Sequence, residues 1–195
     1  MTTWPSLDAI AAAVRSCRAC DLHRTRTQAV PGEGPADARV MLIGEAPGYH
    51  EDRTGRPFVG AAGKTLDALL ARAGLRREQV FITNIVKCRP PKNRDPRPAE
   101  IAACRPYLQA QITLLDPGLL ILLGRFALGL FLPGARIGEW HGKPVRRGRR
   151  WLVPMYHPAA ALYRPALKTV LEADFAAVAP LVAQVLGTPP ATAAR

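Results

Sequence analysis

Four short apolar runs, separated by segments of helical pattern, constrain the fold of this 195-residue chain most strongly. Each run has the length and the continuous apolarity of a buried strand rather than of a helix. The runs cover residues 40–43, 80–85, 119–123 and 151–155. Strands that alternate with helices predict a mostly parallel sheet with both faces covered. We therefore expect the α/β class, with a three-layer α/β/α sandwich around a central four-stranded, mostly parallel sheet.

Helices are expected where apolar residues recur at helical spacing. The expected helices are residues 1–14, a segment through Leu66 and Leu70 that ends at Gly74, residues 98–115, residues 126–131, and residues 168–186 with a break or bend at Pro180. Residues 17–34 have an irregular, turn-rich composition, and the Pro, Thr and Ala of residues 188–195 are typical of a disordered tail. We expect one domain over residues 1–187.

The charge of the chain favours a polyanionic partner. Lys and Arg number 27 against 15 Asp and Glu, which gives a net charge of +12. Nucleic acid is the first candidate, and a merely solvated basic surface is the alternative. The basic segment 136–150 is expected to be a loop or hairpin that either contacts phosphate or is only solvated.

No segment of the sequence resembles an export signal or a membrane span. The longest apolar run, residues 118–123, is far shorter than a transmembrane helix requires. No stripe of apolar residues marks an interface. We expect a cytoplasmic protein that does not bind membranes and that is a monomer.

Polar residues follow each predicted strand. Glu45 comes after the first strand, Asn84 lies at the end of the second, Arg125 follows the third, and His157 follows the fourth. Ligands bind at the carboxyl ends of the strands in an open parallel sheet. Glu45, Asn84 and His157 are therefore expected to converge on one pocket.

Four cysteines suit a metal site better than a disulfide framework, because the chain carries no export signal. Cys17 and Cys20 form a C-x-x-C pair, and Cys88 and Cys104 are separate single residues. This loose spacing favours a [4Fe-4S] cluster, with zinc or unlinked buried thiols as alternatives. A C-x-x-C redox centre would leave the other two cysteines unexplained.

Residues 44–52, 55–60, 84–91 and 157–158 resemble the signature segments of the family-four uracil-DNA glycosylases, the iron–sulfur type of bacteria and archaea. The resemblance runs from about Cys17 to Leu186 and includes all four cysteines in order. It implies a [4Fe-4S] cluster on Cys17, Cys20, Cys88 and Cys104, and uracil in single- or double-stranded DNA as the substrate.

The resemblance also implies roles for individual residues. Gly44, Glu45 and Ala46 would line the uracil pocket, and Phe58 would stack on the flipped base. Asn84 would recognise the uracil edge, since a carboxamide can both accept from N3–H and donate to O4. His157 would donate to uracil O2 as charge grows on the leaving base.

The water and the DNA need further residues. Better-known uracil glycosylases have an Asp where this chain has Ala46, so the carboxylate that positions water is expected to be Glu45, with Glu51 and Asp52 as alternatives. Leu162, Tyr163 and Arg164 resemble the loop that penetrates DNA in this family. The expected phosphate contacts are Arg53, Arg56, Lys64, Lys87, Arg89, Lys92, Arg94 and the cluster at residues 146–150.

Particular residues distinguish the chain from related activities. Ala46 and the absence of a His in residues 92–96 distinguish the chain from the relative that traps uracil-DNA covalently, and Glu45 distinguishes it from the family-five glycosylases. A glycosylase that acts on a broader range of deaminated bases is an alternative. A non-enzymatic iron–sulfur or zinc DNA-binding module would suit the charge and the cysteines equally, but would have no use for Glu45, Phe58, Asn84 and His157 together.

Overall fold

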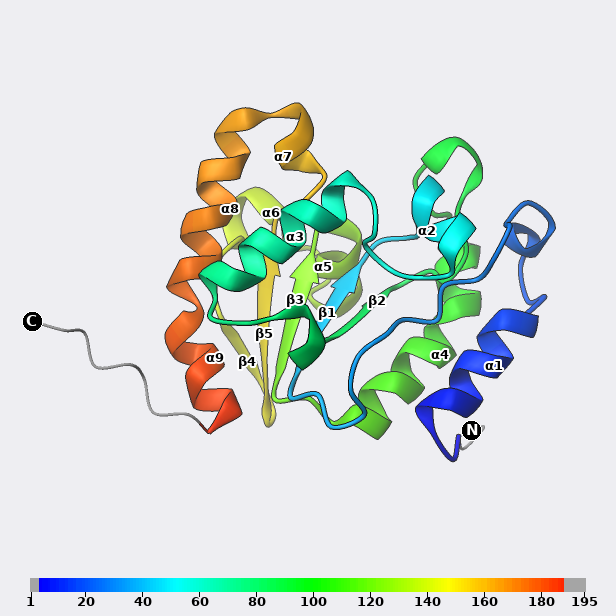
Figure 1. The fold of residues 1–195 in the computed structure, drawn as a ribbon, viewed down its shortest axis with the longest axis horizontal. Coiled ribbons are helices and arrows are strands. Elements are labelled where there is room, and N and C mark those ends of the chain that lie inside the picture. Colours follow the sequence, from blue (N-terminus) through cyan, green and yellow to red (C-terminus); the bar gives the residue numbers. More distant parts are fainter. Residues whose placement is uncertain (1–3, 188–195) are drawn as a thin grey trace, which may run out of the picture.

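The centre of the fold is a five-stranded sheet, seen in the computed structural model, which describes residues 4–187 (Figure 1). Its strands are β1 (Val40–Gly44), β2 (Phe81–Asn84), β3 (Leu119–Leu123), β4 (Val145–Arg147) and β5 (Arg150–Met155). They lie in the order β2-β1-β3-β5-β4, and only the edge strand β4 is antiparallel to its neighbour. The α/β class and the mostly parallel sheet are confirmed. The sheet has five strands rather than four, because the segment expected to be a loop or hairpin forms a hairpin that supplies β4.

Twelve helical segments connect and cover the strands in the described part of the chain. The α-helices are α1 (Leu7–Ser16), α2 (Tyr49–Thr54), α3 (Ala61–Arg72), α4 (Pro98–Leu115), α5 (Arg125–Phe131), α6 (Ile137–Trp140), α7 (Ala160–Tyr163), α8 (Pro165–Ala177) and α9 (Ala179–Leu186). The 3₁₀ turns are η1 (Asp21–Arg24), η2 (Arg77–Gln79) and η3 (Pro91–Asn93).

Two apolar layers lie on opposite faces of the sheet. Alternate residues of each strand point to opposite faces, so Met41 and Ile43 of β1 join one layer while Val40 and Leu42 join the other. Helices α1, α4, α5 and α6 cover the first face, and α3, α8 and α9 cover the second (Figure 1). Because both faces are buried, the central strands β1 and β3 are continuously apolar, and this is the three-layer sandwich predicted from the sequence.

Helix boundaries follow local signals where such signals exist. The predicted helix 98–115 is α4, which begins with Pro98 in its first turn. Gly74 follows α3 with a φ of +73°, and Leu75 N–H donates to the Leu70 carbonyl at 2.9 Å, which is the predicted left-handed helix end. The predicted helix 168–186 begins earlier, at Pro165, and divides at Val178 into α8 and α9. The predicted helix 1–14 begins at Leu7, and its residues 1–3 and the predicted tail 188–195 lie outside the described residues.

Within residues 4–187, one helical stretch has the length and composition of a membrane span. It is Pro165–Leu186, with a mean hydropathy of 1.5 over 18 residues. This stretch comprises α8 and α9, whose Leu171, Phe175 and Val182 are buried against the sheet. The apolar residues of α8 and α9 therefore serve in part to cover one face of the sheet.

Candidate active site and cysteine pocket

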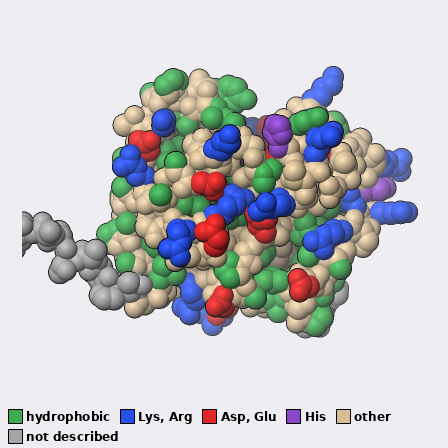
Figure 2. Space-filling model, in the orientation of Figure 1, with side chains coloured by type: hydrophobic (Ala, Val, Ile, Leu, Met, Phe, Trp, Pro, Cys, Tyr) green, Lys and Arg blue, Asp and Glu red, His purple; other side chains and the backbone are tan. Residues whose placement is uncertain are grey.

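A cavity of about 520 Å³ opens at the carboxyl ends of β1, β2 and β5. Glu45, Asn84 and His157, which the strand order predicted to converge, all line it. The other lining residues are Ala46, Pro47, Gly48, Glu51, Phe58, Ala62, Pro90, Asn93, Arg94, Asp95, Arg125, Ala159 and Tyr163. The upper edge of the molecule is notched between the side that carries α7 and the side that carries α2 (Figure 2).

Asn84 ends β2 with its side chain buried, and its carboxamide Oδ1 has no hydrogen-bond partner among the described residues. An unpartnered buried acceptor costs about 1–3 kcal/mol, so it indicates a ligand that supplies a donor. Gly44 lies directly behind this side chain. A Cβ on Gly44 would lie 2.8 Å from Phe58 Cζ and closer still to Asn84 Oδ1, so only glycine allows this arrangement.

Phe58 has a left-handed backbone conformation, with a φ of +52°, although it is not a glycine. Arg77, in η2, donates from its guanidinium to the carbonyls of Pro57 and Phe58, the latter at 3.0 Å. On the other side of the turn, Glu51 Oε1 accepts from the N–H groups of Val59 at 2.9 Å and Gly60 at 3.0 Å. These contacts hold a strained turn that places the Phe58 ring against the cavity.

His157 follows β5, and its ring stacks on Phe58 with centroids 5.5 Å apart. Burial lowers the pKa of His157 to about 4, so the ring is neutral at pH 7. The Ala159 N–H donates to His157 Nδ1 at 3.2 Å. Because Nδ1 accepts this bond, the neutral ring carries its proton on Nε2, which leaves one N–H donor available to a ligand.

Three carboxylates were candidates for positioning water, and two of them are engaged in holding the backbone. Glu51 accepts from the N–H groups of Val59 and Gly60, and also from Gly48 N–H at 3.1 Å. The buried Asp52 accepts from Thr27 N–H at 2.9 Å. Glu45 faces the cavity, and among residues 4–187 no hydrogen bond to its carboxylate is found. Burial, together with the charge of Asp95, raises the pKa of Glu45.

The rim of the cavity contains an ion pair that sequence reasoning missed. Arg125, the first residue of α5, binds Asp95 of the loop after η3, and both line the cavity. Arg94, a predicted DNA contact, also lines the cavity, but its guanidinium is bound to Glu100 at 2.6 and 3.0 Å. Arg94 therefore anchors this loop to α4. No local pattern in the sequence joins Asp95 to Arg125, which lie 30 residues apart.

Helix α7 lies on the rim and carries the predicted DNA-penetrating residues. Leu162 is 46% exposed and Tyr163 is 84% exposed. Arg164 caps the end of α7 and is exposed as well. Large apolar side chains this open to solvent are available to a partner.

Two of the expected phosphate contacts do not face the cavity: Lys87 is buried, and the basic turn before β5 lies on the opposite side. Lys87 is fully buried, and its Nζ donates to Thr83 Oγ1, the Asn84 carbonyl and Gln111 Oε1 at 2.6–2.8 Å. Burial lowers the pKa of Lys87 to about 7. The basic turn between β4 and β5 lies at the amino ends of the parallel strands, opposite the cavity, and there Arg149 and Arg150 bind Asp116. Its charge therefore does not face the cavity.

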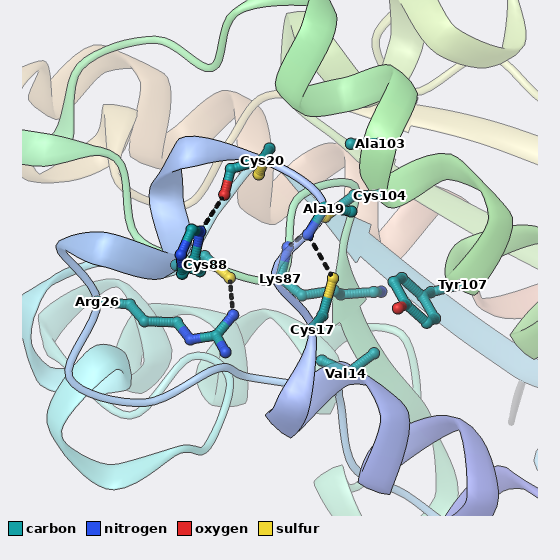
Figure 3. Close-up of a pocket in the computed structure, with 11 residues that line it drawn as sticks. Val14, Cys17, Ala19, Cys20, Arg26, Lys87, Cys88, Ala103, Cys104 and Tyr107 are labelled. Atoms are coloured by element: carbon teal, nitrogen blue, oxygen red, sulfur yellow. Dashed lines mark hydrogen bonds between the residues drawn. The ribbon is translucent and has the colours of Figure 1, made fainter.

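All four cysteines line one small pocket (Figure 3). Cys17 ends α1, Cys20 precedes η1, Cys88 follows β2, and Cys104 lies within α4. Four thiols brought together from the C-x-x-C pair and two distant single cysteines are a donor set that suits a metal cluster. Within residues 4–187, however, no three His, Cys, Asp or Glu side chains stand at the mutual spacing of a metal site.

Donors surround the sulfurs of this pocket. Arg26 Nη1 donates to Cys88 Sγ at 3.0 Å, Lys87 N–H to Cys104 Sγ at 3.4 Å, and Ala19 N–H to Cys17 Sγ at 3.5 Å. Burial raises the pKa of Cys88, and raises that of Cys104 to about 11. Buried thiols become thiolates readily only when a bound cation compensates their charge. The donors and the burial therefore fit a metal cluster held by thiolates.

The comparisons with known proteins agree with this geometry. The family model of the Uracil DNA glycosylase superfamily matches residues 31–179. The chain therefore belongs to the uracil-DNA glycosylase superfamily.

Curated relatives define its place within that superfamily. The chain is 49% identical to a type-4 uracil-DNA glycosylase of Archaeoglobus fulgidus, over 87% of this chain and 90% of the relative. It is 51% identical to a type-4 enzyme of Saccharolobus solfataricus, over 87% and 83% of the two chains. A type-5 enzyme of Thermus thermophilus is 38% identical over only 64% of this chain and 63% of its own length. The chain thus groups with the type-4 members, as its motifs predicted.

Proposed function

We propose that this chain is a monofunctional uracil-DNA glycosylase that hydrolyses the N-glycosidic bond of uracil in DNA and leaves an abasic site for base excision repair. The membership of the type-4 group supports this activity. The observation that carries it is the unpartnered Asn84 Oδ1 buried beside the cavity. We place this activity in the cytoplasm of a prokaryotic cell, where the DNA lies.

Recognition of uracil would use Asn84 and Phe58. The Asn84 carboxamide would accept from uracil N3–H and donate to O4, a pattern that cytosine inverts. Phe58 would stack on the flipped base from the strained turn that Arg77 and Glu51 hold. Gly44 and Ala46 would allow the base to approach the end of β1 closely.

Bond cleavage would use His157 and Glu45. As the bond between C1′ and N1 breaks, its electron pair passes to the uracil ring, and Nε2–H of the neutral His157 would stabilise the charge on O2. The sugar is left with oxocarbenium character, and water adds to C1′. Glu45, a carboxylate facing the cavity, would position that water and accept its proton.

Contacts with DNA would lie along the rim. Leu162 and Tyr163 of α7 would fill the space that the flipped base leaves, and Arg164 would hold a phosphate. Their exposure supports these roles. Both single- and double-stranded DNA would be substrates.

The four cysteines would hold a [4Fe-4S] cluster, which the type-4 relationship and the thiol donor set support. Such a cluster, when bound, would cross-link the end of α1, the η1 segment, the end of β2 and α4. Cys88 lies four residues after Asn84 in the chain, and the buried Lys87 donates to the Asn84 carbonyl at 2.7 Å. A cluster that stabilises the cysteine pocket would therefore also stabilise the end of β2, where Asn84 lies.

The experiment separates catalysis from DNA binding. Asn84→Ala and His157→Gln should abolish release of uracil from an oligonucleotide and leave the affinity for uracil-free DNA within about twofold. The matched control is His141→Gln, since His141 binds Asp174 at 2.7 Å and does not line the cavity. Variants that still excise uracil at the wild-type rate would contradict the assignment, and a non-enzymatic DNA-binding module would show no release even in the wild type.

A further inference from the structure

Tyr49 is an exposed aromatic residue beside the cavity to which the activity above gives no role. It is the first residue of α2 and follows Gly48, which lines the cavity. Its side chain is 49% exposed. The described chain has four exposed large apolar side chains, namely Tyr49, Leu114, Leu162 and Tyr163.

Three of these four residues line the cavity or are next in the chain to a residue that lines it: Tyr163 lines it, Leu162 precedes Tyr163, and Tyr49 follows Gly48. Leu162 and Tyr163 lie on α7 and Tyr49 lies on α2, and Figure 1 shows these two helices at opposite sides of the upper end of the fold. Leu114 lies instead near the end of α4, and it does not line the cavity. Exposed apolar surface costs free energy unless a partner covers it, so its concentration at the mouth indicates a ligand that extends beyond the pocket on both sides.

Two arginines surround the Tyr49 ring. The guanidinium of Arg89 lies 5.2 Å from the ring centroid and that of Arg53 lies 5.7 Å from it. Arg53 Nη1 also donates to the Tyr49 hydroxyl at 3.5 Å, and the His50 ring meets Tyr49 edge-on at 5.4 Å. About half of the surface of Tyr49 is still open to solvent, so these contacts orient the side chain without burying it.

This group is continuous with the cavity. Arg89 Nε donates to Asn93 Oδ1 at 2.7 Å, and Asn93 and the adjacent Pro90 both line the cavity. A strand whose uracil occupies the cavity therefore passes close to Tyr49 where it leaves the mouth on the α2 side.

We propose that Tyr49, Arg53 and Arg89 form a stacking platform for an unpaired nucleotide next to the flipped uracil. The aromatic ring and the guanidinium planes offer surfaces on which a base can stack, and the two positive charges suit its phosphates. A base within a duplex is already stacked and paired, and it would have to leave both partners to reach the ring. The platform therefore strengthens binding of single-stranded DNA and contributes little to binding of duplex DNA. This inference rests on the proposed function.

The test compares Tyr49→Ala with Tyr49→Phe, and Leu114→Ala serves as a matched loss of an exposed apolar side chain. Uracil excision is measured on a single strand and on the same strand in a duplex. Loss of one base–aromatic stack predicts that Tyr49→Ala raises KM for the single strand roughly 5- to 100-fold, with kcat and the duplex KM within about twofold. Tyr49→Phe, which keeps the ring, and Leu114→Ala should match the wild type.

A binding measurement keeps the inference separate from the proposed activity. The Kd for a uracil-free single strand is measured for the wild type, Tyr49→Ala and Arg53→Gln. Tyr49→Ala should weaken it, and Arg53→Gln should lower the salt dependence by about one phosphate contact. An equal loss on single strand and duplex, or no loss on either, overturns the platform. A wild type that excises no uracil but whose single-strand affinity falls with Tyr49→Ala overturns the proposed activity and supports the platform.

Discussion

The strained turn at Phe58 gives a quantitative prediction for Arg77. A left-handed conformation costs a non-glycine residue about 1–3 kcal/mol, so the φ of +52° at Phe58 requires surrounding contacts to maintain it. Arg77, whose side chain is 17% exposed, supplies two charged hydrogen bonds to the carbonyls of Pro57 and Phe58. A hydrogen bond to a charged group contributes about 1.5–3 kcal/mol, and a shorter Gln side chain would recover part of one. Arg77→Gln is therefore expected to lower the free energy of unfolding by about 2–4 kcal/mol.

The effect of Arg77→Gln on activity should be transmitted through Phe58. If the ring loses its stacking position, kcat/KM for uracil should fall roughly 5- to 100-fold, the value of one base–aromatic stack. In a double-mutant cycle with Phe58→Ala, Arg77→Gln should then reduce kcat/KM by no more than about twofold further, because the two residues act through the same ring.

Arg56→Gln is the matched control for this cycle. Arg56 binds the same Glu33 as Arg77, at 2.8 Å, but makes no hydrogen bond to the Pro57 or Phe58 carbonyl. Any loss of kcat/KM in Arg56→Gln should reflect only the phosphate contact expected of Arg56, so it should be the same with and without the Phe58 ring. The reasoning is refuted if Arg77→Gln lowers kcat/KM equally with and without the Phe58 ring, or if it lowers stability and leaves kcat/KM intact.

Four further predictions concern the pocket and the cysteines. Gly44→Ala should abolish most uracil excision, because the added Cβ overlaps Asn84 Oδ1. It should also lower the free energy of unfolding by about 1–3 kcal/mol. Wild-type activity with normal stability would contradict this prediction. Burial raises the pKa of Glu45, whereas that of His157 is lowered to about 4. The fall of kcat at low pH should therefore report protonation of Glu45, and it should vanish in Glu45→Gln. A fall of kcat at low pH that persists in this variant would assign it to another group. The depressed His157 pKa also means that the unfolded chain binds more protons between pH about 4 and 6.5, so stability should rise with pH in that window, and less so in His157→Gln. Cys104→Ser should reduce the bound iron and the melting temperature together, and unchanged iron content would remove Cys104 from the ligand set.

The placement of the active-site residues could be predicted from the sequence because it follows from the strand order. Parallel strands bring their carboxyl ends to one edge, so Glu45, Asn84 and His157 converge whatever the details of the intervening helices. The apolar strands and the helix after Pro98 have strong local signals, and the structure reproduces them.

Features without a local signal could not be predicted. Arg77 lies 19 residues after Phe58, and nothing in the intervening sequence indicates that its guanidinium reaches that turn. The helices α2 and α7 have only six and four residues, too few to show an apolar period. Charge alone does not reveal orientation, so the basic turn before β5 could not be assigned to the side opposite the cavity, nor Lys87 to the interior.

The most direct test of the account is release of uracil from an oligonucleotide that carries one uracil, single-stranded, opposite G and opposite A, with thymine in its place as the control. Alkali-labile strand scission reports the abasic site. A uracil-DNA glycosylase should produce scission at uracil in all three contexts and none at thymine. A preparation with its full content of iron and sulfide that produces no scission at uracil would contradict the proposed activity.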